Sequence, residues 1–266
     1  MTILLCIAVF LATYLINATT ISLFYHRGLA HDGLILHPRL RRFVATWGIW
    51  LTGLDPKAWV CMHRRHHAFS DTPDDPHSPV HYGFVGVLLG QLRSYEKTLV
   101  KLIRRDRAYS QRVNDLEFPI SWVIRKRMWF LPYAVHLGVA VALSAVTGIW
   151  GLGAAYFLGM MSHPLEGWAV NSLGHAMGGR NFAIADNSRN NHFAAWLIMG
   201  EGYQNNHHAY PRSAKFSYRA PEVDLGYRLS LVLQRTGMLR VREATLIPAP
   251  ADREAIDPGL ESASPL

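Results

Sequence analysis

The chain has 266 residues, of which 50% are hydrophobic and only 17% are charged, and its mean hydropathy is +0.05. Soluble domains usually carry about 25% charged residues, so the deficit indicates a membrane protein. Lys and Arg outnumber Asp and Glu by 27 to 19. Without an aromatic-rich basic repeat, this excess fits cytoplasmic segments near anionic lipid and not nucleic-acid binding. The two cysteines, Cys6 and Cys61, do not form the pattern of a disulfide scaffold.

The first segment, 2–25, contains no charged residue. Because about 20 apolar residues suffice to cross a bilayer, this segment predicts a membrane-spanning helix. A cleaved signal peptide is the alternative, but no basic region precedes the apolar residues. The polar side chains of Asn17, Thr19, Thr20 and Ser22 also favour a packed helix that is retained in the protein.

Later apolar stretches predict helices of two kinds. The stretch 43–54 is too short to cross a bilayer, which indicates an interfacial or re-entrant helix. Formal charge is again absent from 128–165, which predicts a helical hairpin with spans at about 129–147 and 150–172. The end of the chain is rich in Pro, Ala, Asp and Glu, and we expect 243–266 to be a disordered tail.

Together these segments predict an all-α fold, an integral membrane helical bundle with a histidine-rich cap, in one domain that covers 1–242. Arginines in 27–42, 125–127 and 180–189 flank the spans on one side, whereas the bend of the hairpin has no Lys or Arg. The positive-inside rule therefore places the histidine clusters in the cytoplasm.

Histidines recur at spacings that place imidazoles on one face of a helix. In HRRHH at 63–67 the imidazoles stand at i, i+3 and i+4, and QNNHH at 204–208 repeats the spacing with glutamine first. Residues three and four apart share a helical face, so the two motifs predict two halves of one metal site. His26 and His31 are about 140° apart on an ideal helix. They address different metals unless the helix end distorts, which Gly28 makes easier.

Eight of the 14 histidines fall in clusters. They are His26, His31, His63, His66, His67, His175, His207 and His208. Neutral imidazole suits iron, zinc and copper, and a set of this size is too large for one zinc but fits two metals. The zinc-peptidase signature H-E-x-x-H is missing, and the carboxylates of soluble di-iron bundles are almost absent from the clusters. A solvated polar patch at the membrane surface is the alternative for any single cluster; their recurrence on one predicted side favours a metal centre.

Four motifs in order resemble the histidine boxes of the membrane fatty-acid desaturases, and the acyl-CoA desaturase branch is the most similar. They are HRGLAH at 26–31, HRRHH at 63–67, NSLGH at 171–175 and QNNHH at 204–208. The flanking stretches FSDTPDDPH at 69–77 and GEGYQNNHHAYP at 200–211 are similar as well. The resemblance runs from about residue 14 to residue 240. It implies a di-iron enzyme that uses O2 to insert a cis double bond, with delta-9 as the expected position, into a long acyl chain.

The resemblance also implies roles for individual residues. The eight clustered histidines would be ligands of two Fe ions, and Asn171, one helical turn before His175, would hold a water on one iron. Members of the family usually begin the last box with histidine, whereas this chain has Gln204. Its amide either binds the metal, holds a metal-bound water, or leaves a site for one iron; a degenerate, inactive enzyme is the remaining alternative. Family members also usually have a helical hairpin before the first box, whereas one helix precedes it here.

Partners follow from the same resemblance. The substrate would be a long-chain acyl-CoA or acyl-lipid, and the lipid bilayer would surround the protein. Nucleic acid is not expected as a partner. Because no fused haem or iron–sulfur motif is visible, electrons would come from an external donor, a ferredoxin or a small haem cytochrome with its reductase. The expected location is the bacterial inner membrane, with the active site on the cytoplasmic side.

Two other functions remain open from the sequence. A lipid hydroxylase with the same irons also begins by abstracting hydrogen. A non-redox membrane metal-binding or transport protein would need polar ligands along its spans, whereas the histidine clusters lie at the predicted cytoplasmic ends.

One pair of ionisable residues lies inside the last apolar segment. His163 and Glu166 are three residues apart, and ionisable groups at such depth are often functional or paired. A contact that only supports a helix kink at Pro164 explains them equally well.

Overall fold

The computed structural model describes residues 1–242 and residue 244, and it is mostly helical, as predicted. The helices are α1 (Thr2–Thr19), η1 (Thr20–Ala30), α2 (Pro38–Thr52), α3 (Pro56–Phe69), α4 (Pro79–Tyr82), α5 (Val87–Ile103), α6 (Arg107–Ser110), η2 (Gln111–Val113), α7 (Trp122–Arg125), α8 (Leu131–Thr147), α9 (Trp150–Met160), α10 (His163–Ala176), α11 (His192–Leu197), α12 (Gln204–Ala209) and α13 (Leu225–Arg235). Apart from residue 244, the predicted tail 243–266 lies outside the described residues.

The fold is not purely α-helical, because one small antiparallel sheet joins distant parts of the chain. Strand β1 (Leu34–Leu36) pairs with β2 (Leu239–Val241), with Leu34 opposite Val241. Leu34, Leu36 and Leu239 are buried. The sheet therefore covers apolar side chains while it ties the chain after η1 to the chain after α13.

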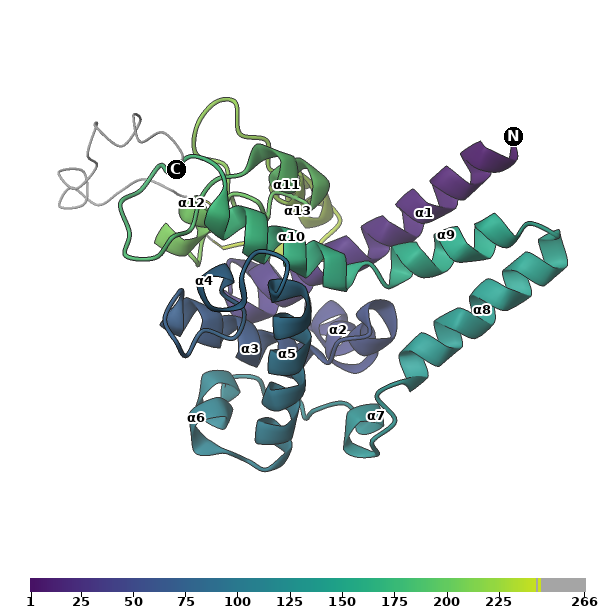
Figure 1. Cartoon of the computed structure of the whole chain (residues 1–266), viewed down its shortest axis with the longest axis horizontal. Coiled ribbons are helices and arrows are strands. Elements are labelled where there is room, and N and C mark those ends of the chain that lie inside the picture. Colours follow the sequence, from purple (N-terminus) through teal and green to yellow (C-terminus); the bar gives the residue numbers. More distant parts are fainter. Residues whose placement is uncertain (243, 245–266) are drawn as a thin grey trace.

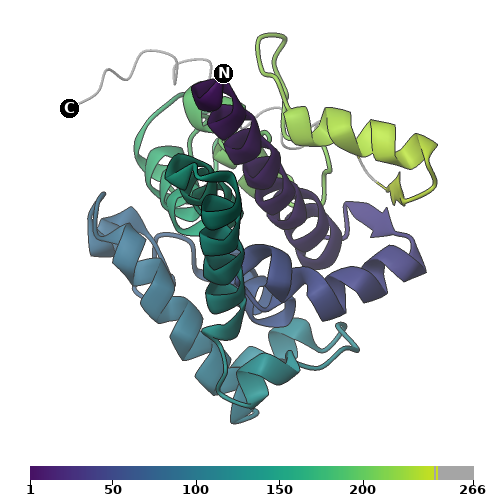
Figure 2. The ribbon, with the colours of Figure 1, turned by 90° about the vertical axis from the view of Figure 1, so that its right-hand side faces the viewer.

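Three helices project from the remainder of the molecule as an arm, which we call the apolar arm (α1, α8 and α9). Helix α9 packs between α1 and α8, and the N-terminus lies at the tip (Figure 1). Figure 2 views the molecule from the end of this arm. Exposed apolar side chains occur along all three helices. They include Leu4, Ile7, Leu11, Leu15, Val135, Leu137, Val139, Val141, Val146, Trp150 and Leu158.

One helix among the described residues is long and apolar enough to cross a membrane, and it runs from Thr2 to Ala30 through α1 and η1. It continues beyond the predicted span 2–25. Helix α8 is a shorter apolar helix, so the predicted membrane bundle is not confirmed. Helix α2 overlaps the predicted interfacial helix 43–54 but begins earlier, because His37 caps it and Pro38 occupies its first turn.

The predicted single helix 150–172 is broken in two. Helix α9 ends at Met160 and α10 begins at His163, with Pro164 in the first turn of α10, where a missing N–H is tolerated. The side chain of Asn17 donates a hydrogen bond to the carbonyl of Met160 over 2.6 Å. A side chain of α1 therefore supplies the hydrogen bond that the last carbonyl of α9 lacks. After the break, α10 takes a new direction toward the histidines.

Glycines allow the helices of the apolar arm to approach closely. A Cβ added at Gly159 would lie 2.1 Å from Thr13 Oγ1 and 2.7 Å from the carbonyl oxygen of Phe10 in α1. Close approach of this kind through small residues is common where apolar helices pack in membranes.

We expect Gly159→Ala to destabilise the protein by about 1–3 kcal/mol, because the new methyl overpacks the contact between α1 and α9. The matched control is Gly138→Ala on α8, where an added Cβ meets no atom within 4 Å. That change is expected to be neutral or stabilising by up to about 1 kcal/mol, since Ala has the higher helix propensity. Thermal unfolding of both purified variants in detergent measures the difference, and equal midpoints would contradict the close packing.

Candidate metal centre

The eight histidines singled out in the sequence come together from η1, its C-terminal end, α3, α10 and α12, in two groups. In each group the candidate ligand atoms all lie within 4.8 Å of one another. The first group is His26, His31, His63, His67 and His207. The second group is His66, His175 and His208. The predicted halves of one site are thus parts of two adjacent groups.

The end of the first helix is distorted in the way that His26 and His31 require in order to meet. Segment η1 is a π-helix, and the N–H of His31 donates to the carbonyl of His26 over 3.1 Å. An i→i+5 hydrogen bond closes a wider turn than that of an α-helix. Residues five apart consequently approach one face, and the two imidazole centroids are 5.0 Å apart.

Helices α3 and α12 each supply both groups. His63 and His67 belong to the first group and His66 to the second, while His207 belongs to the first and His208 to the second. Adjacent histidines point in different directions on a helix, so each short helix bridges the two groups. QNNHH therefore does not present one shared face to one metal.

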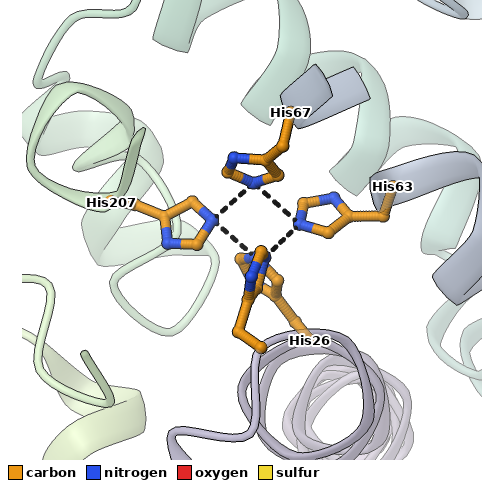
Figure 3. Close-up of side chains that lie close together, drawn as sticks. His26, His63, His67 and His207 are labelled. Atoms are coloured by element: carbon orange, nitrogen blue, oxygen red, sulfur yellow. Dashed lines mark hydrogen bonds between the residues drawn. The ribbon is translucent and has the colours of Figure 1, made fainter. Parts of the chain in front are cut away.

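The imidazoles of the first group turn their Nε2 atoms toward a common centre (Figure 3). The Nε2 atom of His63 lies 2.7 Å from that of His31 and 3.0 Å from that of His67. The Nε2 atom of His207 lies 2.9 Å from those of His26 and His67. A neutral imidazole carries only one N–H, so ordinary hydrogen bonds cannot account for every one of these contacts. Converging nitrogens of this kind can ligate a metal ion.

Burial keeps most of the first group in the neutral form that a metal requires. Desolvation is the main cause that lowers the pKa of His31, His63, His67 and His207 well below its ordinary value, and the neighbouring histidines add to the effect. At neutral pH these side chains therefore offer lone pairs and not positive charges.

Four carboxylates, of which those of Asp75 and Glu201 are buried, accept a hydrogen bond from the other imidazole nitrogen of four histidines. In each case the nitrogen is Nδ1. It lies 3.0 Å from Asp75 in His66 and 3.2 Å from Asp71 in His175. It lies 2.7 Å from Asp186 in His208 and 2.6 Å from Glu201 in His26. A carboxylate that accepts from Nδ1–H leaves the lone pair on Nε2, which is how metal-binding histidines are commonly oriented.

The second group also fits a metal ion. The Nε2 atoms of His66, His175 and His208 are buried and have no hydrogen-bond partner among the described residues. A buried polar atom without a partner costs about 1–3 kcal/mol. A divalent metal bound by these three nitrogens would remove that cost, and imidazole donors suit iron.

The sequence does not predict these carboxylates: they are almost absent from the histidine motifs along the sequence but lie next to the histidines in space. Burial raises the pKa of the Asp71 carboxyl, but the hydrogen bond and charge of His175, together with hydrogen bonds from Ser78 and Asn187, outweigh burial and bring the pKa to about 2. Asp75 and Asp186 are shifted downward in the same way by His66 and His208. For Asp71, Asp75 and Glu201 the signal lay in the stretches that flank the histidine motifs, DTPDDP and GEG, whereas Asp186 lies in neither stretch.

Asn171 and Gln204 lie beside the groups, in the lining of one pocket that also includes His26, His63 and Glu201. The Gln204 side chain is buried and its Nε2 donates to the carbonyl of Glu201 over 2.7 Å. Its Cγ would be 2.5 Å from a Cβ added at Gly174. Gln204 therefore packs against α10 next to His175.

A buried arginine holds Glu201 from the side opposite His26. Arg27 is 1% exposed, and its guanidinium lies 2.5 Å from Glu201 and 3.1 Å from Asp224. The same group stacks on the ring of Phe216 at 3.8 Å. Arg27 thus fastens η1 to the segment that precedes α13, which stabilises the carboxylate that orients His26.

Comparison with known proteins agrees with the resemblance found in the histidine motifs. The family model for fatty acid desaturase matches residues 2–223. The chain is 33% identical to the icosanoyl-CoA 5-desaturase of Limnanthes douglasii, over 82% of this chain and 59% of that protein. It is 32% identical to the acyl-CoA C20 Delta5-desaturase of Anemone leveillei, over 83% of this chain and 67% of that protein. It is 30% identical to the Delta-9 acyl-lipid desaturase 1 of Arabidopsis thaliana, over 86% of this chain and 72% of that protein.

We expect Arg27→Met to destabilise the protein by about 3–5 kcal/mol, because it leaves Glu201 and Asp224 buried without their cation. The control is Arg242→Met, which removes an ion pair with Asp32 whose side chains are 42% and 51% exposed. That loss should be no more than about 1 kcal/mol. Unfolding of the purified variants in detergent measures both effects. Equal losses would show that Arg27 does not act as a buried clamp.

Proposed function

Because this chain belongs to the fatty acid desaturase family, we propose that it inserts a cis double bond into a long-chain acyl group. In this reaction two adjacent methylene groups lose one hydrogen each, and O2 is reduced to two waters with two electrons and two protons from outside. The observation that carries the proposal is the assembly of eight imidazoles in two groups, the first of which lines, through His26 and His63, the same pocket as Asn171 and Gln204.

The two histidine groups would each hold one iron. In the second group, Asn171 would hold a metal-bound water and Gln204 would either bind the metal or support a ligand of it. Iron bound there would supply the oxidising power that an unactivated C–H bond requires. The protein's own contribution is to keep the imidazoles neutral and oriented, through burial and through the carboxylates that accept their Nδ1–H groups.

The pocket supplies the means to position an acyl chain. Its apolar lining includes Ile21, Leu54, Trp59, Val170 and Ile198, and these residues lie beside the histidines that line it. Side chains of this kind exclude water, and burying methylene groups against them is favourable by about 25 cal/mol per Å² of apolar surface removed from water. A chain in this pocket would bring one pair of carbons near the first group, whose His26 and His63 line it.

The apolar arm supports a membrane location. The helix Thr2–Ala30 is long enough to cross the bilayer, and α8 and α9 carry exposed apolar side chains beside it. We propose that the arm is embedded in the bacterial inner membrane and that the histidine groups lie on the cytoplasmic side. The crossings proposed for 129–147 and 150–172 rest on the sequence, since α8 and α9 are each shorter than the bilayer core.

Substrate and double-bond position are finer proposals. The relatives carry names that specify acyl-CoA or acyl-lipid substrates and delta-5 or delta-9 positions. The chain spans 59% of the length of the icosanoyl-CoA 5-desaturase. We propose a long-chain acyl-CoA or acyl-lipid and retain delta-9 as the expected position. Electrons would come from a ferredoxin or a small haem cytochrome with its reductase.

Expression in a host that lacks unsaturated fatty acids, followed by fatty-acid analysis, tests the activity. We expect new cis-monounsaturated chains, produced only with O2 and iron, and none from the His175→Ala variant. Hydroxylated chains instead would favour the hydroxylase alternative. An unchanged lipid profile from folded, iron-loaded protein with a competent electron donor would argue for a metal-binding protein without this reaction.

Gln204 gives a second test, which separates its role from that of the histidines. We expect Gln204→His to keep two irons and measurable activity, because the imidazole supplies the ligand usual in the family. Gln204→Ala should lose activity by about 10–100-fold, the usual loss when a group that supports a metal ligand is removed. Gln111→Ala, at an exposed position in η2, is the control. Turnover and iron content like the parent's in Gln204→Ala would exclude Gln204 from the site.

A further inference from the structure

The pocket that reaches the first histidine group has a second polar region. His163 and Glu166 lie in the first turns of α10, and both line this pocket. Each residue is only 6% exposed. Neither belongs to the candidate metal groups found among the described residues. We refer to these two side chains as the His163–Glu166 pair.

Each member of the pair has one polar atom that the protein leaves without a partner. Glu166 Oε1 accepts a hydrogen bond from Ser162 over 2.5 Å, whereas Oε2 is buried and has no partner among the described residues. His163 Nε2 lies 3.4 Å from the hydroxyl of Tyr133, whereas Nδ1 is likewise buried without a partner in the described chain. Buried polar groups normally find partners, so a pair that lines a pocket and lacks them indicates a place for a ligand.

The chemistry of the pair restricts that ligand. Residues three apart share a helical face, so the free atoms of His163 and Glu166 belong to one side of α10. A hydroxyl group can donate to a carboxylate oxygen and accept from an imidazole N–H at the same time. The lining near the pair combines the apolar side chains of Ile21, Leu92 and Val170 with the amide of Gln91, which donates to the carbonyl of Pro164 over 2.7 Å. With few polar groups to solvate a charge, such a lining favours a neutral polar group over a charged one.

We propose that the His163–Glu166 pair binds a hydroxyl group on the acyl chain, so that this protein prefers hydroxylated chains to unsubstituted ones. The proposal rests on the proposed function, because it assumes that the pocket holds an acyl chain. Asn171 marks the metal end of the pocket on α10, and Glu166 and His163 lie about 8 and 12 Å from it along the helix axis. The hydroxyl would therefore be bound about one and a half to two helical turns from the metal end of the pocket.

Binding of free fatty acids tests the proposal without turnover. The probes are stearic acid and a series of octadecanoic acids with one hydroxyl at successive mid-chain positions, each displacing a fluorescent fatty acid from the purified protein. We expect at least one hydroxylated isomer to bind about tenfold more tightly than stearic acid, the factor that corresponds to one net hydrogen bond. Equal binding of all the probes would overturn the proposal and would mean that the pair binds only water.

Variants show whether the preference depends on the pair. Glu166→Leu and His163→Phe should bind stearic acid at least as well as the parent and should lose the preference for the hydroxylated isomer. Leu165→Ala, at a side chain 63% exposed on the same helix, should keep that preference. If Glu166→Leu is unfolded, Glu166→Gln is used, and a reduced preference is again expected. A preference that persists in folded Glu166 and His163 variants overturns the assignment.

The same experiment separates this proposal from the proposed function. Preferential binding of a hydroxylated chain, abolished in Glu166→Leu, supports the pair even if no double bond is formed in the expression test. Desaturation of unsubstituted chains without any preference for hydroxylated probes supports the enzyme and overturns the role of the pair. No binding of any fatty acid also overturns it.

Discussion

The structure depends on bringing many imidazole lone pairs to one buried place without bringing positive charge there. Nitrogens 2.7 Å apart, as in His31 and His63, repel strongly if both rings are protonated. Burial prevents this repulsion, because it lowers the pKa of both rings and so favours their neutral form. The carboxylates that accept Nδ1–H, such as Glu201 from His26, then fix which nitrogen faces inward.

The secondary structure follows from the same requirement. An ideal α-helix would turn His31 away from His26, and the π-helical segment η1 brings them to one group. The break between α9 and α10 has a related consequence, since it lets α10 leave the apolar arm and carry His175 to the second group. Departures from regular helix are thus concentrated where the chain turns from the arm to the histidines.

Ionic contacts connect the site to the C-terminal part of the chain. Arg27 joins Glu201 to Asp224, the residue that caps α13. A buried network of this kind is costly unless every member is paired. The position of His26 therefore depends on residues nearly two hundred positions later in the sequence, and the first group forms only when the chain has folded around it.

The sequence alone determined the helical character, the histidines that assemble and the resemblance to the desaturases, because spacing and apolar length are local properties. It left open whether His26 and His31 meet, since that depends on the hydrogen-bonding pattern of η1. It also overlooked Asp71, Asp75, Asp186 and Glu201, because the separation between a carboxylate and its imidazole follows no fixed spacing: it is 9 residues for Asp75 and His66 and 104 for Asp71 and His175. Only tertiary structure divided adjacent histidines between two groups, since the division depends on which distant histidines lie opposite each ring: His26 and His67 lie next to His207, whereas His175 is grouped with His208.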